Sequence, residues 1–148
     1  MMNLLLKNGI LLFLVFCPSI GMNAQSVLGK WKTIDDHSGE TKSVVKIYEK
    51  DGKVFGDIVH VFSKDTCTSN ADKKHKYEGM TIIRDMEKKG NQYENGTLMD
   101  PGSGKEYKAK IWLNSDNPNV LNVRGYVGIF YRTQNWIRLE KIDSEKSN

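Results

Sequence analysis

The sequence predicts an all-β protein built on a single antiparallel sheet of roughly eight strands. Apolar and polar residues alternate with a period of two, little recurs at helical spacing, and turn residues separate the alternating segments. Short strands joined by turns along one domain indicate a sheet that closes into a barrel or folds into a sandwich.

Residues 106–113 show the alternation most clearly. Tyr107, Ala109 and Ile111 point to one side of this segment, and the lysines between them point to the other. The segment is therefore expected to be a strand with one buried face.

Turn residues place two hairpins. Asp51 and Gly52 fit a tight turn between strands expected at 43–49 and 53–62. Residues 100–104, which hold Pro101 and two glycines, join the strand expected at 92–99 to the one at 106–113. The remaining strands are expected at 29–34, 80–86, 120–126 and 131–140, with turns at 89–91 and 114–119.

The start of the chain has the layout of a signal peptide over residues 1–24. Lys7 precedes an apolar run at 10–17, Pro18 breaks the run, and Ala24 is the best-placed cleavage residue. A membrane span needs about 20 apolar residues, which this stretch lacks. The sequence thus predicts export to the periplasm or the cell exterior, with residues 25–148 as the β-barrel domain. An uncleaved anchor or a lipid on Cys17 is the alternative.

Charge and cysteine content exclude some classes of protein. A net charge of +4, from 22 basic and 18 acidic residues interspersed along the strands, is too weak to indicate nucleic-acid binding. A basic cluster at 73–76 falls in the longest predicted loop, where charge runs are usually solvated. Cys67 is the one cysteine after residue 24, so no disulfide is expected within the domain.

Catalytic and metal-binding motifs are absent from the sequence. His37, His60 and His75 are scattered over a turn, a strand and a loop, without the spacing of metal ligands. Asp57 and Asp85 could form a glycosidase-like carboxylate pair, although any acidic β-protein offers such pairs. The sequence therefore predicts no cofactor and no metal, and favours a protein that is not an enzyme.

Several motifs resemble a family of exported bacterial proteins, the domain of unknown function numbered 2147. The resemblance extends over nearly all of the chain after residue 24 and implies a lipocalin-like or calycin-like barrel. The motifs are LGKW at 28–31, GDIV at 56–59, DP at 100–101 with GKEYKAK at 104–110, VRGYVG at 123–128 and RTQNW at 132–136.

A barrel of the kind that the resemblance implies brings its first and last strands together. With an even number of strands these two pair antiparallel, so Trp31 and Arg138 are expected to meet, with the guanidinium over the indole closing one end. The alternative is that Trp31 belongs to the core and Arg138 is solvated.

The last two predicted strands supply the candidate ligand-binding residues. Arg132, Gln134 and Trp136 share one face of the final strand, and Arg124 and Tyr126 share one face of the strand before it. A hairpin could gather all five around one spot. The competing assignment turns Ile137 and Leu139 inward and leaves the arginines in water.

Three classes of function remain open. A closed barrel without catalytic clusters most naturally binds a small molecule, and arginines beside an indole suit an anionic or amphipathic one. An envelope-associated interaction module with a filled barrel is the alternative, and a hydrolase or isomerase is the third class.

Overall fold

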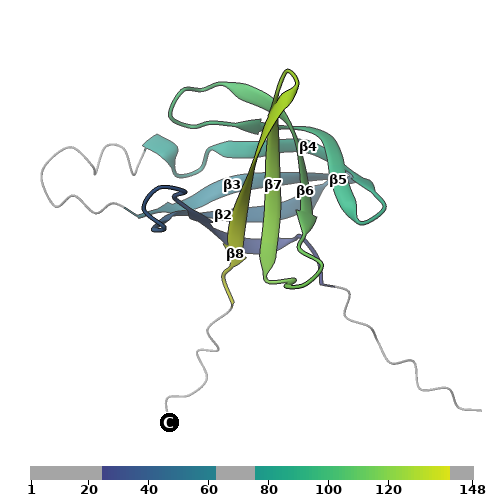
Figure 1. Ribbon diagram of the computed structural model, residues 1–148, viewed down its shortest axis with the longest axis horizontal. Helices are drawn as coiled ribbons and strands as arrows, with labels where there is room; N and C mark the ends of the chain where they lie inside the picture. Colours follow the sequence, from purple (N-terminus) through teal and green to yellow (C-terminus); the bar gives the residue numbers. More distant parts are fainter. Residues whose placement is uncertain (1–24, 63–75, 141–148) are drawn as a thin grey trace, which may run out of the picture.

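The computed structural model describes residues 25–62 and 76–140 (Figure 1). The predicted signal peptide, Cys67 and the basic cluster except Lys76 lie outside the described residues. The strands are β1 (Gly29–Ile34), β2 (Thr41–Lys50), β3 (Lys53–Val61), β4 (Thr81–Lys89), β5 (Gln92–Met99), β6 (Glu106–Leu113), β7 (Val120–Val127) and β8 (Phe130–Arg138).

Each strand pairs antiparallel with the next along the chain, and β1 pairs with β8 to close the barrel. The all-β, eight-stranded antiparallel barrel predicted from the sequence is confirmed. The seam between β1 and β8 is short, because its residue pairs are Trp31 with Arg138 and Lys32 with Ile137. Beyond Lys32 these two strands are not paired, so the wall of the barrel is incomplete there.

The predicted strand bounds agree with the structure to within two residues, except for the end of β4. Strand β4 was expected at 80–86 and extends to Lys89, because its polar last residues pair with the start of β5. A period-two pattern does not reveal a ribbon whose two faces are both polar. Strand β8 ends at Arg138 rather than at residue 140.

Tight turns have the residues that their geometry requires. Asp51 and Gly52 have φ angles of 52° and 75°, as a type I′ turn demands, so the predicted Asp-Gly hairpin is confirmed. Gly128, with φ of 59°, is the first of two residues between β7 and β8, where a type II′ turn places glycine.

The paired strands β4 and β5 share a kink, a backbone irregularity at Asp85 and Asn95. Asp85 and Asn95 have positive φ angles, 55° and 61°, and interrupt the pairing of the two strands. Beside them, a Cβ atom on Gly96 would lie 2.3 Å from the carbonyl oxygen of Arg84 and 2.8 Å from the amide nitrogen of Met86. Glycine is required at this position because two backbones approach too closely for a side chain.

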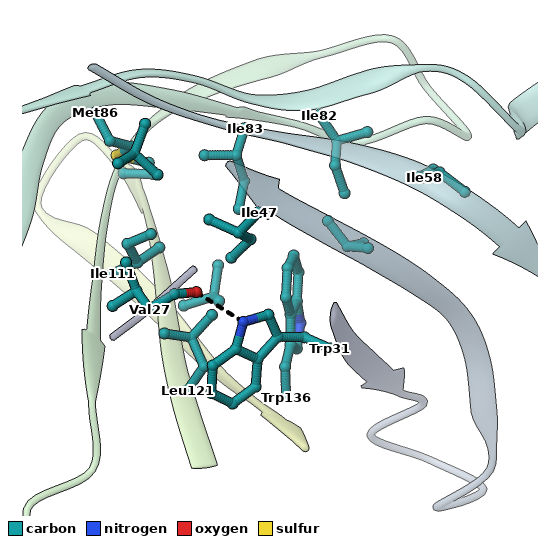
Figure 2. Close-up of a cluster of buried hydrophobic side chains, with 14 residues drawn as sticks. Val27, Trp31, Ile47, Ile58, Ile82, Ile83, Met86, Ile111, Leu121 and Trp136 are labelled. Atoms are coloured by element: carbon teal, nitrogen blue, oxygen red, sulfur yellow. Dashed lines mark hydrogen bonds between the residues drawn. The ribbon is translucent and has the colours of Figure 1, made fainter. Parts of the chain in front are cut away.

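Two indole rings dominate the core of the barrel. Trp31 and Trp136 are 0% and 2% exposed, and Figure 2 shows them packed with Leu121 and Ile47. The indole nitrogen of Trp31 donates a 2.8 Å hydrogen bond to the carbonyl oxygen of Val27. This bond ties the segment before β1 to one end of the barrel.

Candidate ligand site at the open end of the barrel

Side chains that point into the barrel are buried at one end and exposed at the other. In β8 the inward row runs from buried Trp136 through half-buried Gln134 to exposed Arg132. In β1 the same change occurs between buried Trp31 and half-buried Thr33. Inward-facing residues reach solvent only where no side chains cover them, so this end of the barrel is open.

The closed end holds Trp31 and Arg138, which the structure brings together. The Arg138 guanidinium lies 4.2 Å from the centroid of the Trp31 ring. It also donates hydrogen bonds to the carbonyl oxygens of Leu28, Ser26 and Pro118, at 3.4, 2.8 and 3.3 Å. Burial lowers the pKa of Arg138. The ordinary pKa of an arginine is so far above neutrality that the guanidinium nevertheless remains charged. The pair therefore seals this end with a charged group that has several acceptors.

An ion pair lies at the open end, beside the incomplete wall between β1 and β8. Arg132 of β8 bonds the carboxylate of Asp36, which follows β1. The Arg132 side chain is 65% exposed, so it is accessible to a ligand. An exposed pair of this kind contributes about 0–1 kcal/mol to stability.

Uncharged hydrogen-bonding groups line the interior just below this ion pair. The indole nitrogen of Trp136 donates to Oε1 of Gln134 at 3.3 Å. The amide NH2 of Gln134 has no acceptor among residues 25–62 and 76–140, so it is available as a donor. On the adjoining strands β1 and β2, the hydroxyls of Thr33 and Ser43 lie 2.8 Å apart. The open end thus combines a cation with neutral donors and acceptors.

Apolar side chains and a glycine complete the open end. A Cβ atom added to Gly125 of β7 would lie 3.8 Å from Leu98 and 3.8 Å from Tyr107, both of which are half-buried. The absence of a side chain at Gly125 leaves this part of the interior less filled.

The prediction that Arg124 and Tyr126 gather with Arg132, Gln134 and Trp136 is wrong. Cross-strand partners share a face of a sheet, and Arg124 pairs with Thr133 whereas Arg132 pairs with Gly125. Arg124 and Tyr126 therefore lie on the outer face of the barrel. A part for any of the five in ligand binding stays a prediction.

On the outer face, Arg124 is held between two aromatic rings. Its guanidinium lies 5.0 Å from the centroid of Trp112 and 4.2 Å from that of Tyr131. Its Nε donates a 2.7 Å hydrogen bond to the hydroxyl of Thr133. Such contacts contribute about 0.5–1 kcal/mol each at exposed sites, so Arg124 braces β6, β7 and β8 from outside.

Sequence reasoning missed Thr33, Ser43, Leu98 and Gly125 as part of the open end. The strand over 106–113 was expected to turn Tyr107 inward, and this is what the structure has. The same alternation, continued from Trp31 to Thr33, could have assigned Thr33 to the interior. Its partner Ser43 follows only from the register of β1 against β2.

The β1–β2 turn that carries Asp36 is ordered by Asp35. The Lys42 ammonium and the backbone N–H groups of Ser38 and His37 bond this carboxylate and hold its pKa well below the ordinary range. A carboxyl with a lowered folded-state pKa adds stability above its unfolded pKa of about 3.9, and this stability is lost as pH falls through the folded value.

We accordingly expect Asp35→Asn to lower the melting temperature at neutral pH and the deficit to shrink below about pH 4. Asp116→Asn, in the turn after β6, is the control, because the Asp116 carboxylate forms no ion pair within the described part of the chain. Thermal melts from neutral to acidic pH check this. A deficit that is the same at every pH would contradict it.

Neither a metal cluster nor a membrane-spanning helix is found in the described residues. Within residues 25–62 and 76–140, no three His, Cys, Asp or Glu side chains are grouped to hold a metal ion. No helix in these two segments is long and apolar enough to cross a bilayer.

Asp57, one of the carboxylates considered for hydrolysis, lies on the outer face of the barrel beside Tyr48. The pKa of Tyr48 is raised, first by burial and then by its hydrogen bond to Asp57.

Comparison with known proteins gives a family and a fold. Residues 29–138 match a family described as "Uncharacterized protein conserved in bacteria (DUF2147)". Among solved structures, the chain is similar to protein HP1028 from Helicobacter pylori, described as belonging to the lipocalin family. The TM-score is 0.58 at 18% identity, over 78% of this chain and 84% of that one. No curated protein matches the chain. Because the family match runs from the first residue of β1 to the last of β8, the chain belongs to the DUF2147 family and has a lipocalin-like fold.

Proposed function

We propose that this protein is exported and binds a small anionic or amphipathic molecule at the open end of its barrel. The observation that carries the proposal is the inward row of β8, which passes from buried Trp136 through Gln134 to exposed Arg132. An apolar floor below a cation is the arrangement that an amphipathic anion requires.

The chemistry of the open end assigns a part to each group. Arg132 supplies charge-assisted hydrogen bonds to a carboxylate or phosphate, which would replace or share the contact with Asp36. Leu98 and Tyr107 supply apolar walls, and the free amide of Gln134 orients the ligand between them. None of these groups has to act as a base or a nucleophile, so binding without catalysis is the simplest function.

An interaction module with a filled barrel is the second candidate. The observation in its favour is the dense packing at the closed end, where Trp31, Leu121 and Ile47 are at most 1% exposed. A ligand site would then be confined to the open end of the interior, around Arg132 and Gln134.

The test uses cis-parinaric acid, a fluorescent fatty acid that is both anionic and amphipathic. We expect Arg132→Ala to weaken its binding about ten- to a hundred-fold, equivalent to ~1.5–3 kcal/mol, because a charged hydrogen bond is lost. Thermal stability should change little, since the Arg132 side chain is 65% exposed.

The matched control is Arg84→Ala. Arg84 forms a comparably exposed ion pair with Glu106, 2.9 Å apart, on the outer face of β4 and β6. A loss of binding that is equal in both variants, or absent from both, would refute the site. Gly125→Val, which fills the open end without removing a charge, should also weaken binding.

Export and the natural ligand are tested separately from the site. Intact mass of protein recovered from its own host should show a chain that begins at or near Gln25. Native mass spectrometry of the same material should show a small anionic or amphipathic adduct. A chain that keeps residues 1–24 would refute export without affecting the ligand site.

A further inference from the structure

The tip of the β7–β8 hairpin presents four apolar side chains to solvent. Val127, Ile129, Phe130 and Tyr131 are 60%, 90%, 73% and 62% exposed. Figure 1 shows this hairpin projecting past the rest of the barrel at the top of the view. Only two residues, Gly128 and Ile129, form the turn, so the tip is narrow.

This concentration of exposed apolar residues has no counterpart elsewhere in the described chain. The other large exposed apolar side chains, Val59, Phe62 and Leu139, are 36–47% exposed, and none adjoins another in sequence. Nothing in the fold requires apolar residues at 129 and 130, because neither packs into the core. A contiguous exposed apolar patch typically marks a contact surface.

The two strands that form the hairpin carry charges of one sign. Residues 120–138 contain three arginines and no Asp or Glu. Lys108 and Lys110 of the neighbouring strand β6 lie on the same outer face as Arg124, to which Lys110 is directly paired in register. No carboxylate of residues 25–62 or 76–140 forms an ion pair with these two lysines or with Arg124. The outer face next to the tip therefore has an excess of cations, because its carboxylate Glu106 is paired with Arg84.

A shallow groove of about 610 Å³ lies on this outer face directly beside the tip. Tyr126 and Gly128 form its border with the hairpin, and Lys108 and Lys110 lie along it. The one carboxylate on its wall, Glu94, pairs with Lys89 at 3.6 Å, so its charge is partly offset. The groove thus offers ammonium groups at a short distance from exposed apolar side chains.

We propose that the β7–β8 hairpin docks this protein on an anionic phospholipid bilayer. The side chains of Ile129 and Phe130 enter the boundary between headgroups and acyl chains, and Tyr131 lies at headgroup level, where aromatic side chains are favoured. Lys108 and Lys110 meet lipid phosphates, to which basic residues near a membrane surface are attracted.

The shape of the patch favours a bilayer over a protein partner or a second copy of the chain. A stable protein interface buries about 800 Å² on each side and is broad. Four side chains on and beside a two-residue turn form a narrow convex tip, which suits insertion into a deformable surface. Lys108, Lys110 and Arg124, which have no ion-pair partner among the described residues, complement anionic headgroups, whereas two copies of this surface would repel each other.

The position of the tip has a consequence for the open end. Gly125 and Arg132, which border the open end, lie on β7 and β8 within a few residues of the tip. Docking through the tip would hold the open end close to the lipid surface. The docking proposal does not depend on ligand binding, since its residues differ from those of the ligand site.

The experiment measures partitioning onto vesicles of phosphatidylcholine alone and of equal parts phosphatidylcholine and phosphatidylglycerol. All variants are purified with the same N-terminal processing, so that segments outside the hairpin contribute equally to vesicle binding. We expect binding to the anionic vesicles, and at least a ten-fold loss of partitioning for the double variant I129S/F130S. Lys108→Gln should weaken binding to the anionic vesicles and should not change binding to the neutral vesicles. The double variant should have the same melting temperature as the wild type, because the replaced side chains are 90% and 73% exposed.

The matched control is V59S/F62S, which removes exposed apolar side chains elsewhere on the barrel. Equal loss in both double variants, or unchanged partitioning in I129S/F130S, would overturn the proposal. It would also be overturned if wild type failed to bind vesicles and sedimented as a dimer that I129S/F130S abolishes. In that case the tip would join two copies of the chain.

Discussion

Replacing Trp31 by alanine is expected to cost about 3–5 kcal/mol of the free energy of unfolding, the usual range for deleting a buried aromatic side chain. Trp31 has no exposed surface, and its indole nitrogen bonds the carbonyl oxygen of Val27. Its ring also supports the guanidinium of Arg138 at 4.2 Å. One substitution therefore removes core packing, the link to the segment before β1 and the support for Arg138.

The control is Trp112→Ala, which removes the same side chain from the outer face. Trp112 is half-buried and contacts the cations of Lys110 and Arg124, at 5.1 and 5.0 Å from its ring centroid. Its loss should cost about 1–2 kcal/mol, since little core volume is removed and each exposed cation–π contact is worth about 0.5–1 kcal/mol. Urea denaturation of both variants measures the difference. Equal midpoints would show that Trp31 does not hold the closed end together.

The barrel could be predicted from the sequence because each strand carries its own signal. The alternation in β6 and the Asp51-Gly52 turn depend only on neighbouring residues, and both are confirmed. The meeting of Trp31 with Arg138 required one further premise, closure of an even number of antiparallel strands. These conclusions use the direction of strands and the side on which a residue lies within its own strand.

The candidate site could be predicted only within a single strand. Arg132, Gln134 and Trp136 share the inward face of β8, as their spacing implies. Which residues of β7 join them depends on register, and register depends on the length of the turn at Gly128. A shift of one residue would move every side chain of one strand to the opposite face. The two-residue turn pairs Arg124 with Thr133, and this places Arg124 outside the barrel.

The kink between β4 and β5 had no signal in the sequence. Asp85 and Asn95 adopt left-handed backbone angles inside strands, which aspartate and asparagine tolerate better than most residues but do not require. Gly96 is needed because of a backbone that is distant in sequence. Local propensity does not contain such long-range contacts.

Gly96→Ala is the second substitution for which we expect a large effect, a loss of at least ~3 kcal/mol of the free energy of unfolding. A Cβ atom at this position would lie 2.3 Å from the carbonyl oxygen of Arg84, and 2.7 and 2.8 Å from the sulfur and the amide nitrogen of Met86. The sulfur belongs to a flexible side chain that can move. The two backbone atoms belong to β4, so relief of the clash requires β4 and β5 to separate where their pairing is already interrupted.

Gly125→Ala is the matched control, because it adds the same methyl group to another glycine within a strand. Its nearest neighbours, Leu98 and Tyr107, would both be 3.8 Å away, an ordinary van der Waals distance. We expect a change within about 1 kcal/mol for this variant. Urea denaturation of the two variants should therefore give well-separated midpoints. Hydrogen exchange should place the loss of protection for Gly96→Ala in the amides of β4 and β5. Similar midpoints would contradict the prediction. They would mean that the β4 backbone at Arg84 moves to accommodate the methyl group without loss of strand pairing, and that the backbone at Asp85 and Asn95 is flexible.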